Sequence, residues 1–193
     1  MMTGARHLIP SPPLTGHSST SVHEVRTWLR TFVDKQGSRA TVRSYRPSDL
    51  KNVLEMYYQF EPKQLAQRLP PRTDEQIQRW IACLTHDGEN FVALVGRHVV
   101  GHTVLCDLLD GRAELAIFVH QDFRNRGIGT QLLELARRAA LAEGYRQIWI
   151  SVESSNLQAI RVFLKTGFQF TGTFDAESEM ILDLNHSTGQ INK

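Results

Sequence analysis

The sequence predicts an α/β (α+β) fold: a mixed, mostly antiparallel central sheet with a central βαβ unit and flanking helices. Two apolar runs at 91–97 and 99–109 meet at a Gly-Arg-His turn and predict an antiparallel strand pair. An apolar strand at 113–119 precedes a helical pattern, and another apolar run follows at 147–152. That order is typical of a βαβ unit, so the sheet combines both kinds of strand pairing.

The main domain is expected over residues 39–185, and local signals place its other elements. Pro47 suits the first turn of a helix, and Thr73 with Gln76 forms a capping box that opens another. Prolines at 62, 70 and 71 predict a loop or broken helix between these two helices. The remaining elements are a strand at 40–46, helices at 47–60, 73–84 and 156–166, and closing strands at 168–174 and 179–184.

Outside this domain the chain is expected to carry a flexible arm at 1–20, rich in Pro, Ser and Thr, and a tail at 186–193. Residues 21–38 predict an accessory amphipathic helix that opens with a capping box and stops near Gly37. Its apolar face must pack on this domain or on a second subunit, so a homodimer is one alternative. That face carries Val22, Val25, Leu29, Phe32 and Val33.

Composition excludes several classes of protein. The net charge of +2 and the lack of a basic run argue against nucleic-acid binding. No segment approaches the roughly 20 apolar residues that a transmembrane helix needs, so we expect no membrane partner. The histidines show no metal-ligand spacing, and we expect no metal. Cys83 and Cys106 lie in separate apolar stretches, which predicts buried free thiols in a cytoplasmic protein.

The most informative segment is Arg124–Thr130, a glycine-spaced turn between an apolar strand and a helix. Such a turn presents backbone N–H groups and the positive end of the helix dipole, and two arginines lie beside it. This pattern predicts a phosphate cradle, although a tight connection that binds nothing remains an alternative. A nucleoside triphosphate loop is excluded because no Gly-Lys-Ser/Thr ending follows. A dinucleotide site is disfavoured because the third glycine is missing.

At these residues the sequence resembles the GNAT superfamily of acyl-CoA-dependent N-acetyltransferases. The pyrophosphate loop of that family, Arg/Gln-x-x-Gly-x-Gly/Ala, is matched by Arg124–Gly129. A second family motif, Asn-x-x-Ala-Ile followed by an aromatic residue and Gly-Phe, is matched by Asn156–Phe168. The resemblance covers about residues 40 to 184. It implies the same order of elements, with the strands on either side of the loop's helix splayed to form a slot for pantetheine.

The resemblance also implies a set of cofactor-binding residues. Pantetheine of acetyl-CoA would pair with the main chain of Phe118 and Val119, and Asn156 would bond near its end, although Asn156 also suits a helix cap. For at least one of the two arginines we expect phosphate contact. The pyrophosphate would lie on the loop residues Arg124, Asn125, Arg126, Gly127, Ile128, Gly129 and Thr130.

The implied reaction is acylation of a primary amine, which needs a base because an ammonium group is not nucleophilic. Glu114, at the start of the pantetheine strand, is our candidate base, although a glutamate after a hairpin turn is often exposed and idle. Further candidates are Glu61, Asp107 and His120. Many members of the family carry a tyrosine acid where this chain has Phe163.

Two functions remain at this point. One is an acetyl-CoA-dependent N-acetyltransferase that acts by direct attack in a ternary complex on a small-molecule or protein amine. The other is a non-catalytic acyl-CoA-binding sensor or interaction module. The resemblance places the acceptor site around residues 50–84 and the last hairpin, a region without a dense acidic cluster. That region supplies Tyr57, Tyr58, Glu61, Lys63, Arg68 and Arg72.

Overall fold

The computed structural model describes residues 27–63, 70–172 and 175–184. Within these ranges eight strands form one sheet in the order β1-β2-β3-β4-β5-β6-β8-β7. Every neighbouring pair is antiparallel except β5 and β6, which are parallel. The predicted fold class is thereby confirmed. The strands are β1 Leu29–Val33, β2 Arg39–Ser44, β3 Gly88–Val95, β4 His98–Asp107, β5 Arg112–Val119, β6 Gln147–Glu153, β7 Gln169–Phe170 and β8 Glu177–Asp183.

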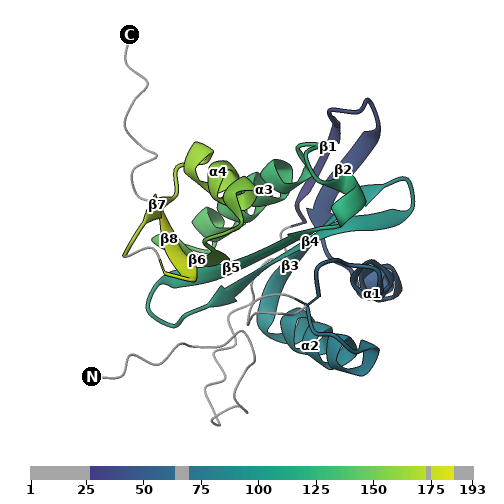
Figure 1. Ribbon diagram of the computed structural model, residues 1–193, viewed down its shortest axis with the longest axis horizontal. Coiled ribbons are helices and arrows are strands. Elements are labelled where there is room, and N and C mark those ends of the chain that lie inside the picture. The colour runs from purple at the N-terminus through teal and green to yellow at the C-terminus, as the bar shows by residue number, and fades with distance from the viewer. Residues whose placement is uncertain (1–26, 64–69, 173–174, 185–193) are drawn as a thin grey trace.

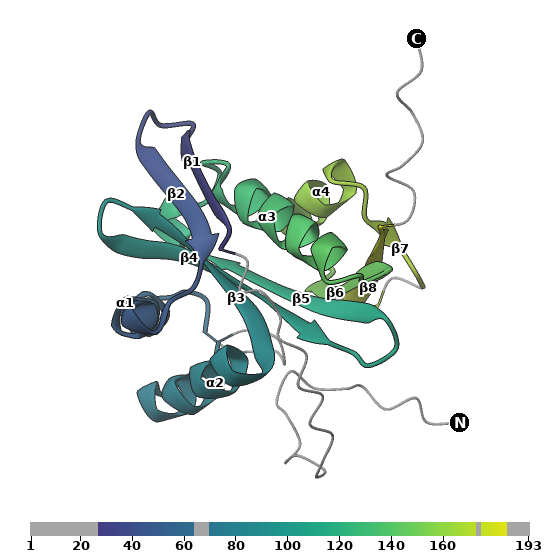
Figure 2. The ribbon, with the colours of Figure 1, turned by 180° about the vertical axis from the view of Figure 1, so that it is seen from behind.

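Helices cover both faces of this sheet. Figures 1 and 2 show α1 and α2 against one face and α3 and α4 against the other. Each face buries its own apolar core, one built with α1 and α2 and one with α3 and α4. The helical elements are the short 3-10 turn η1 Pro47–Asp49, α1 Leu50–Tyr58, α2 Asp74–Asp87, the 3-10 turn η2 Gln121–Phe123, α3 Ile128–Ala142 and α4 Leu157–Lys165.

Helix α3 packs closely on the centre of the sheet. The apolar face predicted for it is buried throughout, from Ile128 to Ala139. Gly101 of β4 allows the close approach, since an added Cβ there would lie 2.9 Å from Leu132 Cδ1 and 3.2 Å from the Phe118 carbonyl oxygen. The start of α3 is therefore fixed beside the carboxyl end of β5.

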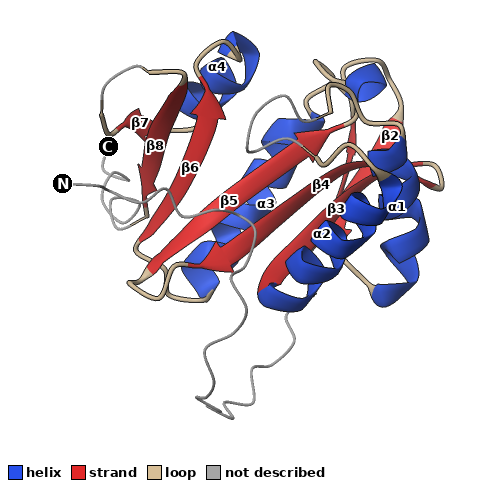
Figure 3. Cartoon of the chain, turned by 60° about the horizontal axis from the view of Figure 1, so that its bottom comes forward, coloured by secondary structure: helices blue, strands red, loops and turns tan. Residues whose placement is uncertain are grey.

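Strands β5 and β6 pair over only part of their length. Their parallel register holds at residues 112–114 with 147–149 and is not continued beyond Glu114 and Trp149. From there the two strands diverge toward their carboxyl ends, as Figure 3 shows. The splay that the family resemblance implied is confirmed.

The predicted accessory helix at 21–38 is wrong over its described part. Residues 21–26 lie outside the described ranges, and Leu29–Val33 forms the edge strand β1, paired with β2. A hairpin turn explains the difference. The Asp34 carboxylate accepts hydrogen bonds from Gln36 N–H at 2.9 Å and Ser38 N–H at 3.0 Å, and Gly37 takes φ +84°. Pairing with β2 thus overrides a helix-like spacing of apolar residues.

Smaller differences occur at element ends. Strand β7 contains only two residues, although we predicted a strand over 168–174, of which 173–174 lie outside the described ranges. Helix α2 continues to Asp87, three residues past its predicted end, so β3 starts directly after it at Gly88.

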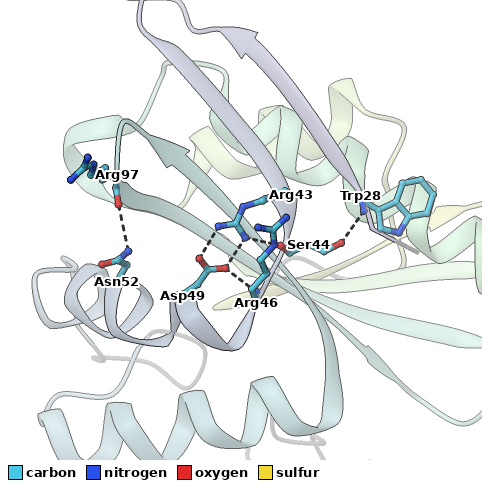
Figure 4. A network of polar contacts seen from close by, with 7 residues as sticks. All are labelled: Trp28, Arg43, Ser44, Arg46, Asp49, Asn52 and Arg97. Atoms are coloured by element: carbon cyan, nitrogen blue, oxygen red, sulfur yellow. Dashed lines mark hydrogen bonds and ion pairs between the residues drawn. The ribbon is translucent and has the colours of Figure 1, made fainter. Parts of the chain in front are cut away.

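A buried ion pair joins β2 to the start of α1 (Figure 4). Arg43 donates to both carboxylate oxygens of Asp49, at 2.6 and 2.7 Å, and Arg46 N–H donates to the same carboxylate at 2.8 Å. Burial alone would raise the pKa of Asp49, but these hydrogen bonds and the Arg43 charge hold the pKa below its ordinary value. The pair fixes the direction in which α1 leaves the sheet.

We predict that Arg43→Met lowers the free energy of unfolding by about 2 to 3 kcal/mol, because Asp49 would be left buried without its partner. Urea denaturation at neutral pH measures this. Because the Asp49 pKa is lowered by folding, the pair stabilises above the unfolded carboxyl pKa of about 3.8, and this stabilisation is lost as the pH falls through the folded value. The gap between wild type and variant should therefore narrow in acid.

Lys51→Met is the matched control, since the Lys51–Glu55 pair spans 3.9 Å between side chains that are 85% and 51% exposed. Such a pair contributes less than about 1 kcal/mol. Equal effects of the two substitutions would show that the Arg43 pair does not anchor α1.

Candidate functional site

A cleft of about 480 Å³ lies between the diverging ends of β5 and β6. It brings together the residues from both motifs: the β5–α3 loop, the first turn of α3 and the start of α4. Of the cofactor-binding residues predicted above, those that line it are Phe118, Val119, Arg124, Asn125, Gly127, Ile128, Gly129, Thr130 and Asn156. Arg126 and Glu114 are not among the described residues that line the cleft.

One wall of the cleft is the main chain of β5. His120 N–H donates to the Val100 carbonyl oxygen at 2.9 Å, which fixes the phase of the β4–β5 ladder. Hydrogen-bonded pairs alternate along an antiparallel ladder, so the main-chain groups of Phe118 face β4. Those of Ile117 and Val119 face the cleft. The groups suited to pairing with an extended ligand are thus on Ile117 and Val119, and Phe118 adds its side chain instead.

The wider end of the cleft is the N-terminus of α3. Helices α2 and α4 begin with side-chain caps. The Thr73 side chain accepts a hydrogen bond from Gln76 N–H, and the Asn156 side chain accepts one from Ala159 N–H. The residue before α3, Gly127, has φ +87° and no side chain that could cap the helix. Since Ile128, Gly129 and Thr130 line the cleft, the uncapped first turn of α3 lies at its wall, where the helix dipole favours an anion.

The two arginines of the loop have different surroundings. Arg124 lines the cleft, where its Nη2 donates to the Glu61 carbonyl oxygen at 2.5 Å and its Nε to the Val119 carbonyl oxygen at 3.2 Å. Arg126 turns away: its Nε and Nη2 lie 2.8 and 2.5 Å from Asp34 Oδ2. We expected phosphate contact for at least one of the two arginines. The Arg126 guanidinium is bonded to Asp34, so Arg124 is the one of the pair that lines the cleft.

The contact between Arg126 and Asp34 ties the β1–β2 hairpin to the loop. The Asp34 side chain is fully buried, and the Arg126 guanidinium also lies over the Phe123 ring, 4.7 Å from its centroid. Burial alone would raise the pKa of Asp34, but hydrogen bonds from Ser38 N–H and Arg126 hold the pKa below its ordinary value. Lys35, the next residue, lines the cleft. Sequence reasoning missed Lys35 because the hairpin was predicted as a helix.

Helix α4 closes the other side of the cleft. Asn156 Oδ1 accepts from Ala159 N–H at 3.1 Å, so its predicted role as a helix cap is confirmed, while its side of the helix also lines the cleft. Gln158 Nε2 donates to Asn125 Oδ1 and bridges α4 to the β5–α3 loop. Both motifs of the sequence therefore meet across one opening.

Glu114 lies just past the narrow end of the cleft. It is the last residue at which β5 pairs with β6, and the next residue, Leu115, lines the cleft. Its side chain is buried rather than exposed and shares the sheet face that α1 and α2 cover. Across the β4–β5 ladder it is opposite Cys106, and its charge contributes to the raised pKa of that thiol.

The other candidate bases do not line the cleft within the described ranges. The Glu61 carboxylate accepts from Lys63 N–H at 3.3 Å. Asp107 Oδ1 accepts from Leu109 N–H in the β4–β5 turn, at the end of β4 away from the phosphate loop. His120 Nδ1 lies 3.7 Å from the Asp122 carboxylate. These geometries leave Glu114 as the candidate nearest the narrow end.

Tyr57, which we placed among acceptor-site residues, is fully buried. Asn90 Nδ2 donates to the Leu84 and Gly88 carbonyl oxygens, so its Oδ1 accepts from His102 Nε2 at 2.9 Å. His102 Nδ1 then accepts from the Tyr57 hydroxyl at 2.8 Å. Burial lowers the pKa of His102 to about 4, which keeps the ring neutral. Tyr57 therefore belongs to the core.

Two kinds of side chain bear on the possible chemistry: an aromatic residue in the cleft and two free thiols that are not among its described lining residues. Phe163 lines the cleft and packs on Phe168, with ring centroids 5.5 Å apart, and no tyrosine is among the described lining residues.

The thiols of Cys83 and Cys106 are free and half-buried. Burial, with the charges of Glu114 and Asp87, raises the pKa of Cys106 to about 11. A thiol with that pKa is a poor nucleophile at neutral pH.

The described ranges hold neither a helix that could cross a membrane nor a cluster of metal-ligating side chains. No helix there has the length and apolar character needed to cross a membrane. No group of three or more His, Cys, Asp or Glu side chains there is arranged to hold a metal ion.

Solved structures share this fold. The GNAT domain of S. lividans PAT superposes with a TM-score of 0.69 at 22% identity, over 81% of this chain and 97% of that one. A GNAT superfamily phosphinothricin acetyltransferase from Sinorhizobium meliloti, in complex with AcCoA, superposes with a TM-score of 0.64 at 21% identity, over 77% of this chain and 90% of that one.

Sequence comparisons agree. The spermine/spermidine N(1)-acetyltransferase of Bacillus subtilis (strain 168) is 33% identical over 79 residues, which cover 39% of this chain. The chain spans about half, 51%, of the length of that relative. Residues 50–168, which include both cleft motifs, match the model of the acetyltransferase (GNAT) family. The chain therefore belongs to the GNAT acetyltransferase family.

Proposed function

We propose that the protein is an N-acetyltransferase that transfers an acetyl group from acetyl-CoA to a primary amine within a ternary complex. The observation that supports this most directly is the cleft itself. It combines a stretch of β5 that β6 does not pair with and a helix N-terminus that no side chain caps. A long ligand with an anionic end and an amide-bearing arm matches these two features.

The residues present fit such a ligand along the length of the cleft. First-turn N–H groups of α3, with Arg124 beside them, would hold the diphosphate of the cofactor. Ile117 and Val119 would pair with the pantetheine amides. From Val119 to Leu115 the strand rises about 13 Å, so the thioester end would lie at the narrow end of the cleft, near Glu114.

The chemistry proposed for the narrow end is removal of a proton from the acceptor ammonium. Glu114 is proposed to accept this proton through a water molecule, because the carboxylate lies just beyond the lining residues and not among them. Main-chain N–H groups of the splayed strand would stabilise negative charge on the thioester oxygen. Since Phe163 cannot donate a proton, the thiolate would leave unaided or take its proton from water; a thiol pKa of about 8.5 permits this.

The acceptor is proposed only as a primary amine, on a small molecule or on a protein. Two of the similar proteins named above, from Bacillus subtilis and Sinorhizobium meliloti, act by their names on spermine or spermidine and on phosphinothricin. These acceptors differ in charge and shape, so they support an amine acceptor and no narrower class.

A second candidate function follows from Phe163. A chain that binds acyl-CoA without the tyrosine acid could serve as a sensor of the cofactor. Thiol detection separates the two functions. The enzyme releases free CoA thiol from acetyl-CoA only when an acceptor amine is added, and both functions predict a rise in melting temperature with CoA. Binding of CoA without amine-dependent release across a panel of amines and lysine peptides would favour the sensor.

We predict that Gly129→Glu abolishes CoA binding while the domain stays folded. Gly129 is not among the positive-φ glycines, and the nearest atom to an added Cβ is Val119 Cγ2 at 3.6 Å, so the backbone tolerates a side chain. A carboxylate there would enter the cradle and repel the diphosphate. Titration calorimetry with CoA and circular dichroism measure the two effects.

Leu141→Glu is the matched control: it adds the same charge to the same helix, at a position 40% exposed at its other end. Normal CoA affinity in a folded Gly129→Glu variant would show that the α3 N-terminus does not hold the diphosphate.

We predict that Glu114→Gln lowers kcat about 100-fold at neutral pH and leaves the affinity for CoA unchanged. The deficit should shrink as the pH approaches the amine pKa near 10, because a free amine needs no base. Steady-state rates across pH measure this, with Glu55→Gln on the exposed face of α1 as control. A rate equal to that of wild type would remove Glu114 as the base.

A further inference from the structure

The β1–β2 hairpin lies beside the segment that leads from β5 into α3, as Figures 1 and 2 show. Two kinds of contact join them. The Asp34 carboxylate binds the Arg126 guanidinium, and Lys35 N–H donates to the Arg126 carbonyl oxygen at 3.2 Å. The hairpin turn is thus held at the phosphate loop by both a side chain and the main chain of consecutive residues.

These contacts fix the position of Lys35. Its main chain is bonded to the loop, its neighbour Asp34 is buried, and Gly37 closes the turn. The Lys35 residue is exposed and lines the cleft at the end where Gly127, Gly129 and Thr130 also line it. A lysine placed by an anchored turn brings an ammonium group to the anionic end of the proposed ligand.

We propose that Lys35 is a further cofactor-binding residue, whose ammonium group binds a phosphate of coenzyme A. This inference rests on the proposed function, since it needs a coenzyme A thioester in the cleft. It adds a side chain from an edge hairpin to a site otherwise built from β5, α3 and α4. Because the Arg126 guanidinium is bound to Asp34, Lys35 would add a second cation to the cleft beside Arg124.

Two phosphate groups of coenzyme A could meet this ammonium: the diphosphate and the 3′-phosphate on the ribose. Dephospho-CoA, which lacks the 3′-phosphate, distinguishes them. If Lys35 binds the 3′-phosphate, replacing the lysine weakens binding of CoA and leaves binding of dephospho-CoA unchanged. If Lys35 binds the diphosphate, replacing the lysine weakens binding of CoA and of dephospho-CoA to the same extent.

The experiment measures the Kd of CoA and of dephospho-CoA by calorimetry for the full chain, Lys35→Met and Lys35→Arg. Lys35→Met should raise the Kd of CoA about tenfold, the size of one charge-assisted hydrogen bond. Lys35→Arg should restore most of the affinity. The difference in the Kd of CoA between the wild-type chain and Lys35→Met should shrink at high salt, because salt screens an exposed charge.

Arg39→Met is the control, because Arg39 is an exposed cation that directly follows the same turn and is not among the residues that line the cleft. In acetyl transfer, Lys35→Met should raise the KM for acetyl-CoA with kcat retained. A Kd for both ligands within twofold of wild type would overturn the role of Lys35. A wild-type chain that binds neither ligand would instead overturn the proposed function.

Discussion

The structure depends on one constraint: parallel pairing of β5 and β6 ends after Glu114 and Trp149. Had the ladder continued, the main-chain groups of Ile117 and Val119 would be satisfied by β6, and no cleft would open. Because it stops, a strand edge that β6 does not pair with is left inside the molecule, where α3 and α4 shield it from other chains. The same divergence brings the start of α3 and the start of α4 to opposite sides of one opening.

Much of this arrangement could be predicted from local sequence. The order of strands and helices from residue 39 onward follows from apolar periodicity, capping boxes and glycine turns, and those signals act over a few residues. The β5–α3 loop is also local, since Gly127 and Asn125 take positive φ where the chain turns from β5 into α3. The slot between the strands followed from family resemblance, because no spacing reveals where a ladder ends.

What could not be predicted depends on contacts between distant residues. Asp34 and Arg126 are 92 positions apart, and their pairing turns the Arg126 side chain away from the cleft and ties the β1–β2 hairpin to the loop. Tyr57 is likewise 45 positions from His102. The hydrogen bond between the Tyr57 hydroxyl and His102 Nδ1 lies in the core, so Tyr57 is a core residue and not part of an acceptor site. In both cases a buried polar partner decided the role, and a single sequence does not show which polar groups meet.

The loop that would carry the cofactor is held from two sides by its own arginines. Arg124 reaches toward the end of α1 and bonds the Glu61 carbonyl oxygen, whereas Arg126 reaches toward the β1–β2 hairpin and bonds Asp34. Between them Asn125 holds φ +62°, a conformation that costs energy for a residue with a side chain and persists only where its surroundings fix it. Both arginines thus form hydrogen bonds that hold the loop in place. Amides fixed before a ligand arrives lose little freedom on binding, so arginines that hold this loop would strengthen an anion site in addition to any direct contact that Arg124 makes.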